Sequence, residues 1–210
     1  MKSPHLIHAG LLLALLALPS FIRELRPWPL YLLVPLALYA LVVAVAPPLR
    51  RSVRWLRVGR FDGVVLSWMA AIIVGSSAAL VLWFVLARPD VGELTDKIPH
   101  VGPMQLILIG ITFSLANAIM EEAIFRGVFQ EALTAEWGPW PAIVIQGVLF
   151  GAIHVQGFPH GLAGMVMASA YGVALGWLRL RSGGMAAACI AHVCADATIF
   201  SLLVLTTSAT

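Results

Sequence analysis

The stretch Glu121-Glu122-Ala123-Ile124-Phe125-Arg126-Gly127 (EEAIFRG) sets two adjacent carboxylates and an arginine within otherwise apolar sequence. A helix through this stretch would carry its charges into or near hydrocarbon, because hydrophobic residues flank it on both sides. Charged side chains inside a membrane are energetically costly and rare outside functional sites. We therefore expect a helical membrane fold that encloses these groups, and we expect the chemistry of the protein to lie here.

The composition is typical of a polytopic membrane protein. Hydrophobic residues make up 60% of the 210 residues, charged residues only 11%, and the mean hydropathy is +0.94. A soluble domain carries about 25% charged residues, so that class is excluded. Seven apolar runs approach the roughly 20 residues that a spanning helix needs. These runs are 6–22, 29–46, 64–87, 103–120, 141–155, 161–178 and 185–205.

We predict an all-α bundle of about seven transmembrane helices with the active site within the membrane. The first run is expected to be a retained helix and not a cleaved signal peptide, since no A-x-A-like site follows it. The sequence contains no long repeat and no Gly/Ser linker. Residues 1–210 are therefore expected to form a single integral membrane domain.

The charges in the loops predict a topology. The loop between the second and third runs holds five arginines, Arg50, Arg51, Arg54, Arg57 and Arg60. The positive-inside tendency places this loop in the cytoplasm, with Arg179 and Arg181 on the same side by parity. The chain is short and poor in loops, and we expect it in a bacterial inner membrane. The arginine loop could also lie on anionic lipid, but nothing in the sequence supports binding of nucleic acid.

Polar residues in the fourth run align on one helix face. If a helix runs from about 103 to 135, Asn117 and Glu121 fall on one polar stripe. Glu122 and Arg126 lie one turn apart and can form an ion pair. The arginine then neutralises one carboxylate and leaves Glu121 available to react. The two adjacent glutamates are thus predicted to have different roles.

Two histidines fall inside later apolar runs. Phe150 lies one turn before His154 in the fifth run, and Asp196 lies one turn after His192 in the seventh. Glu121 and His154 lie 16 and 17 residues from the hairpin turn between their runs, so both are about 25 Å from its tip. His192 is about nine residues beyond the next turn, which makes it shallower by about 10 Å. We therefore expect Glu121 to face His154, and His192 can join them only through helix tilt or a deeper turn.

Small residues predict that these helices approach closely. G-x-x-x-G patterns occur at 147–151 and 172–176, and such patterns mark close packing of membrane helices. Gln146 shares a face with His154, where it could contact a substrate or form a hydrogen bond between helices.

Three motifs then carry a resemblance to a known family. They are E-E-x-x-x-R at 121–126, F-x-x-x-H at 150–154 and H-x-x-x-D at 192–196, each on a predicted membrane helix. In this order they resemble the CPBP family, which comprises CAAX prenyl endopeptidases and bacteriocin-processing intramembrane proteases. The resemblance covers about residues 100–205. The first three runs match that family only in being hydrophobic.

The resemblance implies hydrolysis of a peptide bond within the membrane, an EC 3.4 activity. By motif position, Glu121 would be the general base that activates water, His154 would hold that water, and His192 with residue 196 would stabilise the oxyanion. The implied catalytic residues are Glu121, Glu122, His154, His192 and Asp196, with Arg126 and Phe150 in support. The implied substrate is a membrane-associated protein or peptide in the lipid bilayer.

The aspartate at the end of the third motif departs from the commoner asparagine. An ionised Asp196 would repel an oxyanion. It must therefore be protonated, orient His192, or bind another group.

The same residues could instead bind Zn²⁺, with Glu121, His154 and His192 as ligands. Carboxylate and imidazole suit a catalytic zinc site that keeps one position open. However, H-E-x-x-H, which holds two ligands on one helix, is absent. We favour a mechanism without a cofactor.

Two other classes of function remain open. A non-proteolytic immunity or scaffold protein could keep the fold, and a proton-coupled transporter could use the same carboxylates, although no inverted repeat is visible. The other polar residues are expected to be interfacial or solvated. They are His5, His8, His100, His160, Glu131 and Glu136.

Overall fold

The computed structural model describes residues 4–207, and every regular element within this range is helical. The N-terminal elements are α1 (Pro4–Leu16), α2 (Leu18–Phe21), η1 (Arg23–Leu25), α3 (Leu30–Val45), α4 (Pro47–Ser52), α5 (Gly63–Ala87) and α6 (Gly92–Thr95). The remainder are α7 (Pro103–Glu122), the π-helix η2 (Ala123–Phe129), α8 (Gln130–Trp137), α9 (Pro139–Ile153), η3 (His154–Gln156), α10 (Gly161–Ser182) and α11 (Ala186–Thr207).

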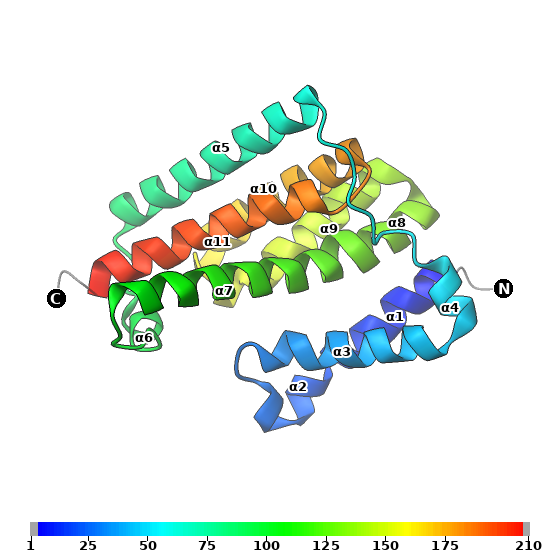
Figure 1. The fold of residues 1–210 in the computed structure, drawn as a ribbon, viewed down its shortest axis with the longest axis horizontal. Helices are drawn as coiled ribbons and strands as arrows, with labels where there is room; N and C mark the ends of the chain where they lie inside the picture. Colours follow the sequence, from blue (N-terminus) through cyan, green and yellow to red (C-terminus); the bar gives the residue numbers. More distant parts are fainter. Residues whose placement is uncertain (1–3, 208–210) are drawn as a thin grey trace.

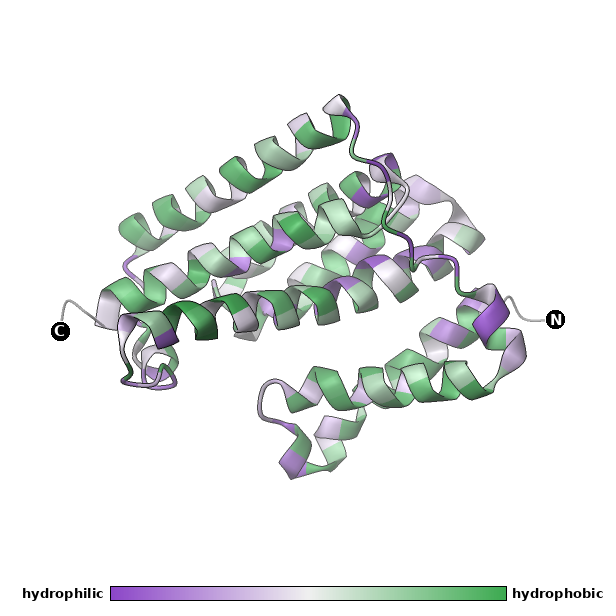
Figure 2. Ribbon diagram, in the orientation of Figure 1, coloured by the Kyte–Doolittle hydropathy of each residue, from purple (hydrophilic) through white to green (hydrophobic). Residues whose placement is uncertain are grey.

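Seven apolar helices correspond to the seven predicted runs. Five segments are long and apolar enough to cross a membrane, namely Pro4–Phe21, Gly63–Ala87, Pro103–Trp137, Gly161–Ser182 and Ala186–Thr207. Leu30–Val45 and Pro139–Ile153 are shorter apolar helices. Figure 2 shows hydrophobic residues along these helices, with hydrophilic residues concentrated at helix ends and in the segment before α5. The predicted fold class, an all-α multi-pass membrane protein, is confirmed.

The central bundle consists of α7 with its continuation through η2 and α8, packed against α9, α10 and α11 (Figure 1). α5 lies along α10 and α11 on one side, and the hairpin of α1 and α3 lies on the other side. α7 approaches α11 closely where Gly110 faces the ring of Phe200. A Cβ at Gly110 would lie 2.7 Å from that ring, so the glycine sets the spacing between these two helices.

The fourth run forms one continuous helical segment, Pro103–Trp137, close to the predicted 103–135. Its middle turn departs from α geometry, because Ala123–Phe129 forms a π-helix directly after the paired glutamates. A π-bulge inserts an extra residue into a helical turn and is frequent at functional sites. The side chains after the paired glutamates therefore point in directions that differ from those of a regular α-helix.

The G-x-x-x-G prediction is confirmed at the contact between α9 and α10. A Cβ at Gly172 would lie 2.9 Å from the Cα of Gly147, so the two backbones touch there. Gln146 is fully buried and its Nε2 donates to the Gly172 carbonyl at 2.8 Å. Of the two roles open to Gln146, the structure shows the hydrogen bond between helices.

Two side chains expected to be interfacial or solvated have partners instead. His8 is buried, with its ring nitrogens 2.7 Å from the Tyr39 hydroxyl and 2.9 Å from the Ser52 hydroxyl. Glu131 forms an ion pair with Arg179 at 2.6 Å. The prediction for His8 was wrong because its partners come from distant parts of the sequence, which local pattern cannot reveal. Glu131 is still partly exposed, so its ion pair is compatible with a solvated position.

The arginine loop is an ordered, extended segment, 53–62. Its backbone bonds to the turn between α10 and α11, where Arg60 N donates to Ser182 O at 2.9 Å and Met185 N donates to Arg57 O at 2.7 Å. This confirms that the loop and the end of α10 share one side of the protein. The ring of Trp55 covers Gly127 in the π-helix, where an added Cβ would lie 2.8 Å from the ring.

Candidate active site

Glu122, Arg126 and His192 form a buried polar cluster between α7, η2 and α11. Arg126 Nη1 lies 2.8 Å from Glu122 Oε1, and both side chains are fully buried. The predicted ion pair one turn apart is therefore present. The same Glu122 oxygen lies 2.8 Å from Nδ1 of His192. Glu122 thus also orients His192, a contact that the sequence analysis did not predict.

Arg126 is held from a further two sides. Its Nη2 donates to the Gly172 carbonyl at 3.3 Å, and its guanidinium lies 4.3 Å from the centre of the Phe150 ring. A cation over an aromatic face is attracted by the ring quadrupole. Phe150 therefore packs against the guanidinium of the arginine.

His192 lies next to Glu121, contrary to the predicted depth difference of about 10 Å. Its Nε2 is 3.6 Å from Glu121 Oε2 and 3.7 Å from Asp196 Oδ1. A depth difference of that size requires the two helical hairpins to turn at one level. Figure 1 shows that the α8–α9 turn extends further along the molecule than the α10–α11 turn, so fewer residues suffice to bring His192 to Glu121.

Asp196 has a partner for each carboxylate oxygen. Oδ1 faces His192 Nε2, and Oδ2 accepts a hydrogen bond from Asn117 Nδ2 at 3.2 Å. The Asn117 carbonyl oxygen in turn accepts from Trp28 Nε1 at 3.2 Å. Because indole N–H can only donate, this contact fixes which end of the amide faces Asp196. Asp196 therefore lies between the His192 ring and the Asn117 amide.

His154 stands where α9 ends and the short η3 helix begins. Its Nδ1 lies 2.7 Å from the carbonyl oxygen of Phe150, one turn earlier. A carbonyl only accepts, so Nδ1 carries the proton and Nε2 is left as an acceptor in the neutral ring. No hydrogen bond or ion pair joins His154 to Glu121 among residues 4–207, but the two side chains line one cavity.

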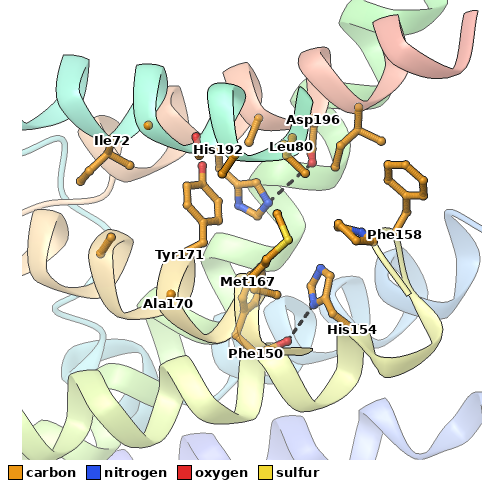
Figure 3. Close-up of a pocket in the computed structure, with 18 residues that line it drawn as sticks. Ile72, Leu80, Phe150, His154, Phe158, Met167, Ala170, Tyr171, His192 and Asp196 are labelled. Carbon is orange, nitrogen blue, oxygen red and sulfur yellow. Dashed lines mark hydrogen bonds and ion pairs between the residues drawn. The ribbon is translucent and has the colours of Figure 1, made fainter. Parts of the chain in front are cut away.

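Two cavities meet at this cluster. The larger, about 690 Å³, is lined by Glu121, Asn117 and Trp28, together with mostly apolar residues of α7, α11 and the α6 region that include Lys97. The smaller, about 360 Å³, lies between α5, α10 and α11 and is lined by His192 and Tyr171 (Figure 3). His154 and Asp196 line both cavities. A molecule spanning both cavities would therefore lie next to Glu121 and next to His192.

Three residues of this site were missed or underrated by sequence reasoning. Trp28 and Tyr171 belong to no motif, and their roles depend on contacts with distant helices. Asn117 had one signal, its place one turn before Glu121 on the polar stripe. That spacing could have identified it as a partner of the site, although not of Asp196.

Comparison with known families supports the resemblance. Residues 103–198 match the family model described as Type II CAAX prenyl endopeptidase Rce1-like. Over this stretch the chain is similar to that family. The matched range contains all three motifs and every predicted site residue, which confirms the resemblance to the CPBP family. No curated protein and no solved structure gives a significant match.

The Rce1-like match indicates a membrane protease, a hydrolase, in general terms. It begins at the first residue of α7 and ends within α11. The α1–α3 hairpin and α5 lie outside it, although Trp28 and α5 side chains line the two cavities. The walls of the site therefore come partly from segments that are not shared with the family model.

Proposed function

We propose that the protein is a glutamic-type intramembrane endopeptidase in which Glu121 is the general base. The observation that carries this proposal is the contrast between the two glutamates. Glu122 forms a buried ion pair with Arg126, contacts His192 and lines neither cavity, whereas Glu121 lines the larger cavity and its Oε2 lies 3.6 Å from His192 Nε2. A carboxylate that no arginine pairs with and that lies at a cavity wall can take a proton from water.

In the proposed reaction, Glu121 accepts a proton from water as the water oxygen attacks the carbonyl carbon of the scissile peptide bond. The bond between that carbon and the amide nitrogen breaks, and the proton passes from Glu121 to the departing nitrogen. His154 can hold the water, because its Nε2 is free to accept a hydrogen bond. His192, when protonated at both nitrogens, donates from Nδ1 to Glu122 and presents Nε2–H to the oxyanion.

Asp196 acts through His192 in this proposal. Its Oδ1 lies on the Nε2 side of the ring, and the Asn117 amide holds its other oxygen. The carboxylate is thereby turned toward the imidazole, whose Nε2–H is the group that meets the oxyanion.

The donor geometry gives no support to zinc as a cofactor. Within residues 4–207, no group of three or more His, Cys, Asp or Glu side chains is arranged to hold a metal ion. We propose a mechanism without metal. Full activity after chelation, with no zinc in the purified protein, is the expected result.

The decisive experiment replaces Glu121 with Gln, which keeps the shape of the side chain and removes the base. The purified variant should lose cleavage of membrane peptides and retain the thermal unfolding midpoint of the parent. Glu136→Gln, at an exposed position on α8, is the matched control and should cleave normally. A Glu121→Gln protein that keeps its cellular phenotype would instead favour the immunity or scaffold function.

The proposed substrate is a protein or peptide anchored in the same membrane, and the proposed location is a bacterial inner membrane with the arginine loop in the cytoplasm. Glu121 lies about 25 Å along the helix from the tip at Trp137, toward the far half of a bilayer. This depth suits trimming of exported or anchored protein tails. Reporter fusions in the 88–100 loop test the topology, and a cytoplasmic signal there would overturn it.

A further inference from the structure

The smaller cavity is bounded by α5, which is attached to the bundle at three points. Trp68 packs against Trp177 of α10 with ring centres 4.7 Å apart, and Trp83 packs against Phe158 at 5.3 Å. Between these pairs, the hydroxyls of Ser77 and Thr198 lie 2.9 Å apart. These contacts hold α5 against the bundle near both ends and in the middle. The cavity beside α5 is therefore defined by a helix in a fixed position.

The wall that α5 presents to this cavity consists mostly of small side chains. Ile72, Gly75, Ser76 and Ala79 recur at helical spacing along the cavity. A Cβ built on Gly75 meets no atom within 4 Å, so the helix is open at its centre. A larger side chain at this position would enter free space without displacing a neighbour.

The opposite wall is apolar apart from the site groups at its base and one free donor. Met167, Ala170 and Ala174 of α10 line it, and Figure 3 shows Met167 and Tyr171 reaching from α10 toward α5 and α11. The Tyr171 hydroxyl is buried and has no hydrogen-bond partner among the described residues. A buried polar group without a partner is costly, so this hydroxyl is poised for an acceptor that a ligand brings.

We propose that this cavity is the specificity pocket of the enzyme and receives a bulky apolar side chain, such as leucine or phenylalanine, from the substrate residue next to the scissile bond. The proposal rests on the protease function proposed above. Tyr171 then donates to the main-chain carbonyl of that residue. Because α5 lies outside the matched residues 103–198, this pocket is set by a part of the chain that the family model does not describe.

Two observations select a substrate side chain over a lipid tail as the occupant. The pocket ends on His154, His192 and Asp196, so whatever fills it lies against the reacting groups. It also adjoins the larger cavity at His154 and Asp196, where the water and the base would lie. A peptide lying across this junction places one side chain in the smaller cavity and its backbone at the histidines.

The test uses a pool of hydrophobic peptides of varied sequence in detergent micelles, with every cleaved bond identified by mass spectrometry. The parent should show a strong preference for a large apolar residue on one side of the cleaved bond. Gly75→Phe should fill the pocket and reduce cleavage of those peptides by at least about tenfold, while peptides with glycine or alanine at that position continue to be cut. Ala170→Phe should do the same from the opposite wall.

Gly10→Phe is the matched control, because a Cβ at Gly10 in α1 also meets no atom within 4 Å. It should leave the preference unchanged. Equal preferences in the parent, Gly75→Phe and Ala170→Phe would overturn the pocket while leaving the protease intact. The proposed function itself would be overturned if the parent cleaves no peptide, or if Glu121→Gln cleaves the same peptides as the parent.

Discussion

Replacement of Arg126 with Met is the most informative perturbation of the buried cluster. Methionine keeps most of the volume of the arginine stem but leaves the Glu122 carboxylate without its cation. Arg126 and Glu122 are both fully buried and lie 2.8 Å apart. Removing one partner of such a pair typically costs about 3–5 kcal/mol, because the remaining charge stays buried without compensation. That range corresponds to roughly two to four orders of magnitude in the unfolding equilibrium.

The chain carries its own reporter for this measurement. Cys189 and Cys194 are free and partly buried on α11. Their labelling by a thiol reagent should therefore accelerate as α11 separates from the bundle. Thermal unfolding in detergent, followed by this labelling and by circular dichroism, should show Arg126→Met unfolding at a clearly lower temperature than the parent.

The double variant Arg126→Met/Glu122→Gln separates loss of packing from loss of charge compensation. With a neutral amide at position 122, no charge is left unpaired, and most of the lost stability should return. The carbonyl oxygen of that amide can still accept a hydrogen bond from His192. The reasoning is refuted if Arg126→Met unfolds like the parent, or if the double variant is as unstable as the single one.

Three further predictions concern the surroundings of the site. Asn117→Ala removes the hydrogen bond to Asp196, and it should lower kcat with little change in KM or in the unfolding midpoint. Gly127→Val places a side chain against Trp55, where an added Cβ already lies 2.8 Å from the ring. It should lower the unfolding temperature and increase proteolysis of the arginine loop in micelles. A hydrogen bond from the Val65 backbone N–H holds the pKa of the Asp62 carboxyl below its usual range, assisted by Arg181 and Arg60. Its contribution is therefore present above the unfolded pKa and is lost as the pH falls through the lower folded pKa. Melting curves should show a larger loss on acidification for the parent than for Asp62→Asn.

The hydropathy pattern was sufficient for the fold class, because each long apolar helix must present a continuous apolar run to lipid. The motif spacings were sufficient for the Glu122–Arg126 pair, since residues four apart on a helix are neighbours whatever the tertiary structure. Contacts between helices were harder to predict from the sequence. The depth of His192 was wrong because it depended on how far each hairpin turn extends, and no local pattern encodes that distance.

The π-helix had no signature in the sequence, because its residues are as apolar as those of an ordinary α-helix. Its place can be understood afterwards. Ala123–Phe129 lies between the paired glutamates and Gln130, whose amide donates to the Gly176 carbonyl at 2.9 Å. Within about two turns, the helix must direct the Glu122 side chain toward His192 of α11 and the Gln130 side chain toward the Gly176 carbonyl of α10. The wider turn of the π-helix rotates the later side chains relative to the earlier ones, so that both contacts form.

Asp196, at the end of the third motif, is held by a residue that no motif includes. Asn117 stands one turn before Glu121 and donates to Asp196, while the indole of Trp28 fixes the orientation of its amide. The third motif ends in Asp196 and not in the commoner asparagine, and Asn117 of α7 supplies a side-chain amide at this place. Trp28, which lies outside the matched residues, holds that amide in position. If this compensation operates, Asp196→Asn should be tolerated in the parent, because two amides can share the site. In the Asn117→Ala background, Asp196→Asn should restore part of the lost kcat. A double variant that is no faster than Asn117→Ala would show that the amide at 117 acts in another way.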